Sequence, residues 1–282
     1  MWLTSDGLNV SQILSLSLGD AKPEDCLHEL IQYVHHIADT MPSPYTLFVS
    51  GGIDSQATLH VWKQSGVPFR AVNVNYDGFN VHDRKEILEF CESHSIPLDI
   101  ISFDVIDFLE NRLEAYAIKY QCASPQICTH MAFSEMVHEG TKIFSGNLAA
   151  RTLSIDNTVF GLYRYAQLSG NSMIPFFLMG SEVASKAAIA LADTVTDDSG
   201  VNYNFKCEQY RKLGVPIIKQ EEKLTGFEKV KIYYDRFPER VTSWMKVAFS
   251  SAKSKRVFDQ LFRNPYLARF KNHYDVTIIV NQ

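Results

Sequence analysis

The fold is decided by residues 45–55, YTLFVSGGIDS, in which a short apolar run ends in two glycines and an acidic residue. Residues 45–49 are typical of a buried parallel strand. Gly51 and Gly52 permit a tight turn, and a helix is expected to begin near Asp54. A strand, a glycine turn and a helix in this order gather backbone N–H groups and a helix N-terminus at one point, which predicts an anion site.

The polar side chains of this loop extend the prediction. Ser50 and Ser55 can donate hydroxyl hydrogen bonds to a bound anion. Asp54 would repel a phosphate, so its natural role is to hold Mg²⁺ against the phosphate oxygens. The structural alternative is a flexible turn with Asp54 as a helix cap, but the strand–turn–helix setting favours the anion site. The loop matches neither the Walker A spacing nor G-x-G-x-x-G.

Strand and helix patterns alternate through the first half of the chain, which predicts right-handed βαβ units and a parallel sheet with helices on both faces. Beyond about residue 150 the pattern predicts a mostly helical extension, with a helix over 181–192 and a surface loop over 193–200. The expected helices are 24–38, 54–66, 81–94 and 105–120, and the further strands are 69–75, 98–103 and 142–145.

Composition and charge indicate an ordinary globular protein with a cytoplasmic location. The 282 residues are 46% hydrophobic and 21% charged, and the net charge of −5 gives no general attraction to nucleic acid or anionic lipid. No apolar stretch approaches the roughly 20 residues of a membrane span, and no secretory signal is recognisable. Five cysteines without a C-x-x-C pair are expected to be reduced.

SGGIDS after a strand resembles the signature of the PP-loop, or N-type, ATP pyrophosphatases. The resemblance implies an adenine-nucleotide α-hydrolase-like fold and the cofactors ATP and Mg²⁺. It divides the chain into a helical lead-in over 1–40, an ATP-binding domain over 41–150 and a substrate region over 151–282. The implied ATP contacts are Ser50, Gly51, Gly52, Ile53, Asp54, Ser55 and Gly146, with adenine against Val72, Asn73 and Val74 and the metal on Asp54.

The order of the parts is most similar to the asparagine-synthase-like branch, which carries a second glycine turn where this chain has Ser145, Gly146 and Asn147. That branch continues with Gly-Glu or Gly-Asp, whereas Leu148 follows here, so the contacts to the acceptor stay open. Only about 44 residues precede the first strand, so no glutaminase domain is expected. Nitrogen would come as free ammonia or from a glutaminase partner. The cysteines disfavour the thiolating and zinc-containing branches.

A proline-broken segment over 121–130 is a candidate substrate loop near the mouth of the sheet. Its alternative is an ordinary connection between helices with a capping serine. The predicted substrate contacts are Ser124, Gln126, His130, Asn147 and Arg151.

Residues 206–236 interleave lysines with aromatic residues, which is compatible either with a polyanion-binding surface or with a solvated amphipathic face. Because the loop lacks a lysine, a cation for the departing pyrophosphate must come from elsewhere, and Lys223 is the predicted catalytic candidate.

These features predict an enzyme that adenylates a small-molecule acceptor, releases pyrophosphate and transfers a nucleophile. The alternatives are a nucleotide-binding module without turnover and an enzyme that modifies a nucleic-acid base. A homo-oligomer is compatible with the sequence.

Overall fold

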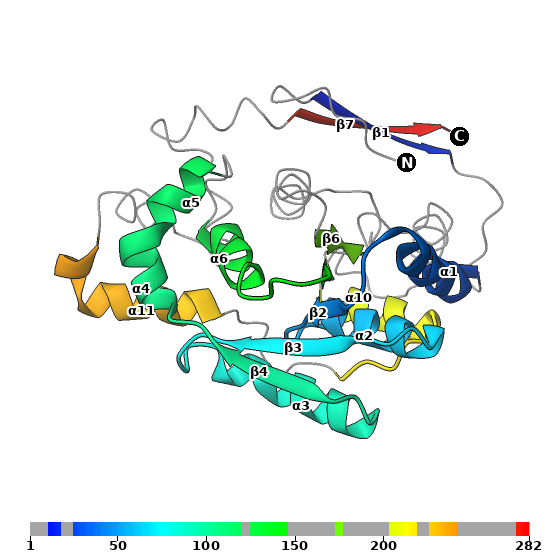
Figure 1. The fold of residues 1–282 in the computed structure, drawn as a ribbon, viewed down its shortest axis with the longest axis horizontal. Coiled ribbons are helices and arrows are strands. Elements are labelled where there is room, and N and C mark those ends of the chain that lie inside the picture. Colours follow the sequence, from blue (N-terminus) through cyan, green and yellow to red (C-terminus); the bar gives the residue numbers. More distant parts are fainter. Residues whose placement is uncertain are drawn as a thin grey trace.

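The computed structural model describes residues 11–17, 25–119, 125–145, 173–176, 203–218, 226–241 and 275–281. Its centre is a five-stranded sheet in the order β4-β3-β2-β5-β6, and every neighbouring pair is parallel (Figure 1). The strands are β2 (Tyr45–Phe48), β3 (Arg70–Asn75), β4 (Leu98–Ser102), β5 (Thr141–Phe144) and β6 (Met173–Pro175).

The direction of chain progression reverses between β2 and β5, which lie side by side. In an open parallel sheet, such a reversal opens a crevice outside the carboxyl ends of the two strands, where ligands bind. The loop that follows β2 therefore begins at the switch point.

Helices cover the sheet on both faces, as the sequence predicts. Leu47 and Phe48 are consecutive, so they point to opposite faces and join separate hydrophobic clusters. One cluster includes side chains of α1 (Asp25–Thr40), α2 (Ile53–Ser65), α3 (Val81–Ser93) and α10 (Tyr203–Lys212). The other includes side chains of α4 (Val105–Asp107), the π-helix η1 (Phe108–Arg112), α5 (Leu113–Lys119), α6 (Pro125–Ser134) and α11 (Gly226–Arg236).

The expected continuous helix over 105–120 is divided into α4, η1 and α5. The Asp104 side chain accepts a hydrogen bond from the Asp107 N–H at 2.8 Å and so caps the first turn. A π turn is closed by i→i+5 hydrogen bonds, and a single turn of five residues is too short for hydrophobic periodicity to reveal. A short 3₁₀ turn, η2 (Pro238–Arg240), follows α11.

A separate two-stranded sheet pairs β1 (Ser11–Ser17) with β7 (Asp275–Asn281) in parallel. Neither strand is expected from the sequence, which predicts a helical lead-in and a mostly helical extension. The β-branched residues 276–280 are a strand signal that the helical prediction missed, whereas the partner of this strand, more than 250 positions away, could not be predicted locally. The expected helix over 181–192 and the loop over 193–200 lie outside the described residues. Within the described part of the chain, no helix has the length and apolar character to cross a membrane.

Candidate functional site

The loop over residues 50–52, Ser-Gly-Gly, follows the carboxyl end of β2 and leads directly into α2. Gly52 occupies the N-cap position with extended backbone, and its carbonyl accepts from Ser55 N at 3.0 Å and Gln56 N at 3.2 Å. A Cβ on Gly52 would lie 3.3 Å from Ser50 Oγ, which is a tight contact. The Ile53 side chain is 2% exposed and packs in the core. Ile53 can therefore contact a bound anion only through its backbone N–H.

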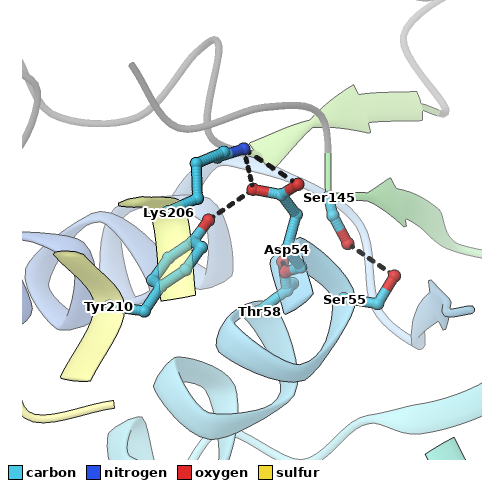
Figure 2. Close-up of polar contacts among 6 residues, drawn as sticks. All are labelled: Asp54, Ser55, Thr58, Ser145, Lys206 and Tyr210. Atoms are coloured by element: carbon cyan, nitrogen blue, oxygen red, sulfur yellow. Dashed lines mark hydrogen bonds and ion pairs between the residues drawn. The ribbon is translucent and has the colours of Figure 1, made fainter. Parts of the chain in front are cut away.

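Three hydroxyl groups converge beside the loop from three segments of the chain. The Ser50 N–H donates to Ser55 Oγ at 3.0 Å, and the Ser50 and Ser55 hydroxyl oxygens lie 3.2 Å apart. Ser145, the residue after β5, donates to Ser55 Oγ at 3.3 Å (Figure 2). The predicted pair of serines is thus brought together, and Ser145 joins it across the switch point.

The Asp54 carboxylate is held by two residues of α10. Lys206 Nζ lies 2.8 Å from Oδ1 and 3.1 Å from Oδ2, and the Tyr210 hydroxyl donates to Oδ1 at 2.5 Å (Figure 2). The side chains of Lys206 and Asp54 are 11% and 19% exposed. Burial, together with the nearby Asp54 carboxylate, holds the pKa of Tyr210 well above its ordinary value, so its hydroxyl remains a donor.

This arrangement changes the predicted metal role of Asp54. Within the described residues, no three histidine, cysteine, aspartate or glutamate side chains are grouped to hold a metal. Mg²⁺ is often bound by one or two carboxylates plus substrate phosphates, so Asp54 suits a metal that arrives with a nucleotide. Oδ1 accepts from Lys206 and Tyr210 and Oδ2 accepts from Lys206, so such a metal would compete with the lysine for the carboxylate.

The predicted adenine strand is buried by the protein itself. The side chains of Val72 and Val74 are 0% and 6% exposed and belong to the core, so they cannot stack on a base. Asn73 Nδ2 donates to the Val49 carbonyl at 2.8 Å, and Asn80 Nδ2 donates to the Val74 carbonyl at 2.7 Å. A contact from this strand to adenine would have to come from backbone N–H or C=O groups that are not already hydrogen-bonded within the protein.

Two of the predicted substrate residues lie on α6. Gln126 is partly buried near the start of the helix. The His130 ring stacks on Phe144, the last residue of β5, at 5.7 Å between ring centroids. His130 Nδ1 is buried and has no hydrogen-bond partner, and burial lowers the pKa of His130 to about 4. Ser124, Gly146, Asn147, Arg151 and Lys223 lie outside the described residues.

The lysine and aromatic segment does not form one basic surface in the described residues. Tyr210, Phe227 and Tyr234 are at most 3% exposed and belong to the core. On the helix surfaces, Lys212 pairs with Glu208 at 3.7 Å and Lys231 pairs with Asp235 at 2.7 Å. These contacts fit the amphipathic interpretation. Lys206 and Tyr210 share one helical face because they are four residues apart, but that spacing alone does not reveal that they contact Asp54.

The loop after β2 and the three serine hydroxyls lie together at the switch point between β2 and β5. The chain thus has a parallel sheet with helices on both faces, and its glycine loop lies at the switch point of that sheet. No family model matches the sequence, and no curated protein sequence is similar to it.

Solved structures with similar folds include two synthetases and a thiolase. The NMN synthetase from Francisella tularensis is 14% identical, with 78% of this chain and 96% of that chain covered and a TM-score of 0.36. The NH3-dependent NAD synthetase from Campylobacter jejuni is 12% identical, with coverages of 68% and 94% and a TM-score of 0.34. The U34-tRNA thiolase NcsA from Methanococcus maripaludis is 14% identical, with coverages of 90% and 82% and a TM-score of 0.37. Likenesses of this size define neither an activity nor a substrate for this chain.

The ion pair between Asp54 and Lys206 should be measurable as a coupling energy. We expect Asp54→Asn and Lys206→Met each to destabilise the protein, and the double variant to be less destabilised than their sum by about 1 kcal/mol. The reason is that each single change leaves its partner poorly solvated without its counter-charge. Denaturant unfolding of the four proteins measures the coupling, and simple additivity within about 0.3 kcal/mol would contradict the contact.

The lowered pKa of the partly buried His130 predicts an acid dependence of stability. The pKa of His130 in the folded state, about 4, lies below its ordinary value of 6.5, so the folded state binds fewer protons between these two values. The stabilisation is therefore present above about pH 6.5 and is lost as the pH falls towards 4. Wild type should lose about 1 to 2 kcal/mol more than His130→Phe between pH 7.5 and pH 5. Equal losses in urea unfolding at the two pH values would contradict this assignment.

Proposed function

We propose that this protein is an ATP pyrophosphatase that adenylates an acceptor, releases pyrophosphate and passes the activated acceptor to a nucleophile. The observation that carries the proposal is a cation beside the loop: Lys206 reaches the Asp54 carboxylate at the start of α2, next to the converging serine hydroxyls. An anion-binding loop, hydroxyl donors and a nearby ammonium group together suit a departing pyrophosphate.

In the proposed reaction, an oxygen of the acceptor attacks the α-phosphorus of ATP. The bond between the α-phosphorus and the bridging oxygen breaks, and its electrons leave with pyrophosphate. Ser50 and Ser55 would donate hydrogen bonds to the leaving oxygens, supported by the backbone N–H groups of the loop. Mg²⁺ bound with ATP would supply charge neutralisation, and Asp54 would hold it. The nucleophile then displaces AMP from the acceptor.

Lys206 takes the role that the sequence assigned to Lys223. The loop carries no lysine of its own, and Lys206 Nζ lies within 3.1 Å of both carboxylate oxygens of Asp54. A lysine held at this point can turn from the carboxylate to a phosphate with little movement, because both anions would lie beside the first turn of α2. Lys223 stays a prediction as a further cation.

A second candidate, a nucleotide-binding module without turnover, is favoured by one observation. The Asp54 carboxylate, the proposed metal ligand, already accepts hydrogen bonds from Lys206 and Tyr210 without a metal. The acceptor as a small molecule, ammonia or a glutaminase partner as nitrogen source, a homo-oligomer and a cytoplasmic location remain predictions.

The reaction class is tested by the position at which ATP is cleaved. ATP labelled at the α-phosphate should give labelled AMP when Mg²⁺, ammonium and a panel of small carboxylic and carbonyl acceptors are present, with pyrophosphate formed in equal amount. Thin-layer separation of the labelled products measures the outcome. Formation of ADP would contradict the proposal, and Mg-ATP binding without AMP from any acceptor would favour the module without turnover.

Lys206→Met should lower pyrophosphate release by about 10²-fold, a typical loss for one group that stabilises developing charge. Lys212→Met is the matched control, because Lys212 lies on the same helix and pairs with Glu208 at its surface. Pyrophosphate release is measured for both variants at saturating ATP. Equal rates in the two variants would remove Lys206 from the reaction.

A further inference from the structure

Gln56, in the first turn of α2, is fully buried, and its side-chain amide forms hydrogen bonds with the backbone of Gly51 and of Ile218. Its Nε2 donates to the Gly51 carbonyl at 2.9 Å and to the Ile218 carbonyl at 2.9 Å. Its Oε1 accepts from the Ile218 N–H at 2.7 Å. A primary amide offers two N–H donors, and both are used here.

We propose that Gln56 is a positioning residue that fixes the phosphate loop in its anion-binding conformation and couples it to residues 215–218. This inference rests on the proposed function, because it concerns how the loop receives pyrophosphate.

The orientation of one peptide group carries the first part of the inference. In a trans peptide the carbonyl and the following N–H point in opposite directions. The Gly51 carbonyl is held towards the buried Gln56, so the Gly52 N–H points away from the interior. That N–H donates to Ser50 Oγ at 3.3 Å, on the side where the hydroxyls converge. Gln56 therefore directs the Gly52 N–H towards the hydroxyls, where a bound anion could replace Ser50 Oγ as its acceptor, without touching the anion itself.

The two hydrogen bonds between Gln56 and Ile218 support the proposed coupling to residues 215–218. They occupy the N–H and the carbonyl of one residue, as a neighbouring strand would, and they join positions 162 apart in the sequence. Val215, three residues earlier, packs in the same core cluster as Tyr210 of α10. The loop and its following helix are thus linked to this part of the chain twice, through Asp54 with Lys206 and through Gln56 with Ile218.

A purely packing role does not account for this residue. The next residues of α2, Ala57 and Leu59 among them, fill the core with apolar side chains. A buried amide is costly unless its polar atoms are bonded, and each bond of Gln56 falls on the loop or on Ile218. Its specific contribution is therefore the geometry of these two segments.

The test uses two variants, one control and inorganic pyrophosphate with Mg²⁺ as the probe. Gln56→Glu keeps the shape but removes at least one of the two donors, because a carboxyl group has one O–H when protonated and none when ionised. Gln56→Met keeps the length without N–H or oxygen atoms. Thr141→Val is the control: Thr141 is fully buried, its hydroxyl donates to the Pro42 carbonyl at 2.8 Å, and it lies at the opposite end of the sheet. It should lower the melting temperature without changing pyrophosphate affinity.

Calorimetric titration of the full chain should show pyrophosphate binding about 10-fold or more weaker in both Gln56 variants than in wild type and in Thr141→Val. Hydrogen exchange gives a second readout. Pyrophosphate should slow exchange of the Ile218 N–H in wild type, and this protection should disappear in Gln56→Met.

A folded Gln56→Met protein that binds pyrophosphate with wild-type affinity would overturn the inference, whatever Gln56→Glu does. If pyrophosphate binding weakens but the Ile218 protection persists, the coupling to residues 215–218 is overturned. Failure of wild type itself to bind pyrophosphate or Mg-ATP would overturn the proposed function, and the role of Gln56 with it.

Discussion

The contact between the Asp54 carboxylate and the Lys206 ammonium is the interaction on which the site depends. It joins the first turn of α2 to α10 through two residues that are 152 positions apart in the sequence. A lysine that is 11% exposed needs an opposite charge close by, and the Asp54 carboxylate supplies it. The Tyr210 hydroxyl donates a further hydrogen bond to the same carboxylate. In the proposed function, the loop after β2 therefore acquires its cation from a different part of the chain, in contrast to loops that carry their own lysine.

The site has more hydrogen-bond donors than free acceptors, and this excess of donors limits the reactions that it can support. The described residues around the loop offer three serine hydroxyls, backbone N–H groups and Lys206, against one carboxylate that is already paired. Such a set stabilises negative charge on a leaving group better than it removes a proton. An acceptor that brings its own anionic oxygen would need no general base. Pyrophosphate departure from ATP matches this balance.

The parts of the fold that could be predicted are those with local signals. Residues 45–55 contain the strand, the turn and the helix start within eleven positions, and the alternation of patterns gives the parallel sheet. The spatial partners could not be predicted, because Lys206, Tyr210 and Ile218 reach the loop only through the tertiary fold. The adenine strand illustrates the same limit, since its apolar residues signal a strand equally well whether they face a ligand or the core. The β-branched run of residues 276–280 is typical of a strand, but its parallel pairing with β1 is a tertiary contact that neither segment specifies alone.

The central claim is that the loop after β2 binds the phosphates of ATP and that Lys206 is their cation. A crystal structure of the protein with Mg²⁺ and the α,β-methylene analogue of ATP tests it most directly. We predict that the terminal phosphates lie within hydrogen-bond distance of the N–H groups at Gly51 and Gly52, with Lys206 turned from Asp54 towards a phosphate oxygen. Phosphates bound elsewhere, or Lys206 still fully paired with Asp54 beside a bound nucleotide, would contradict the account.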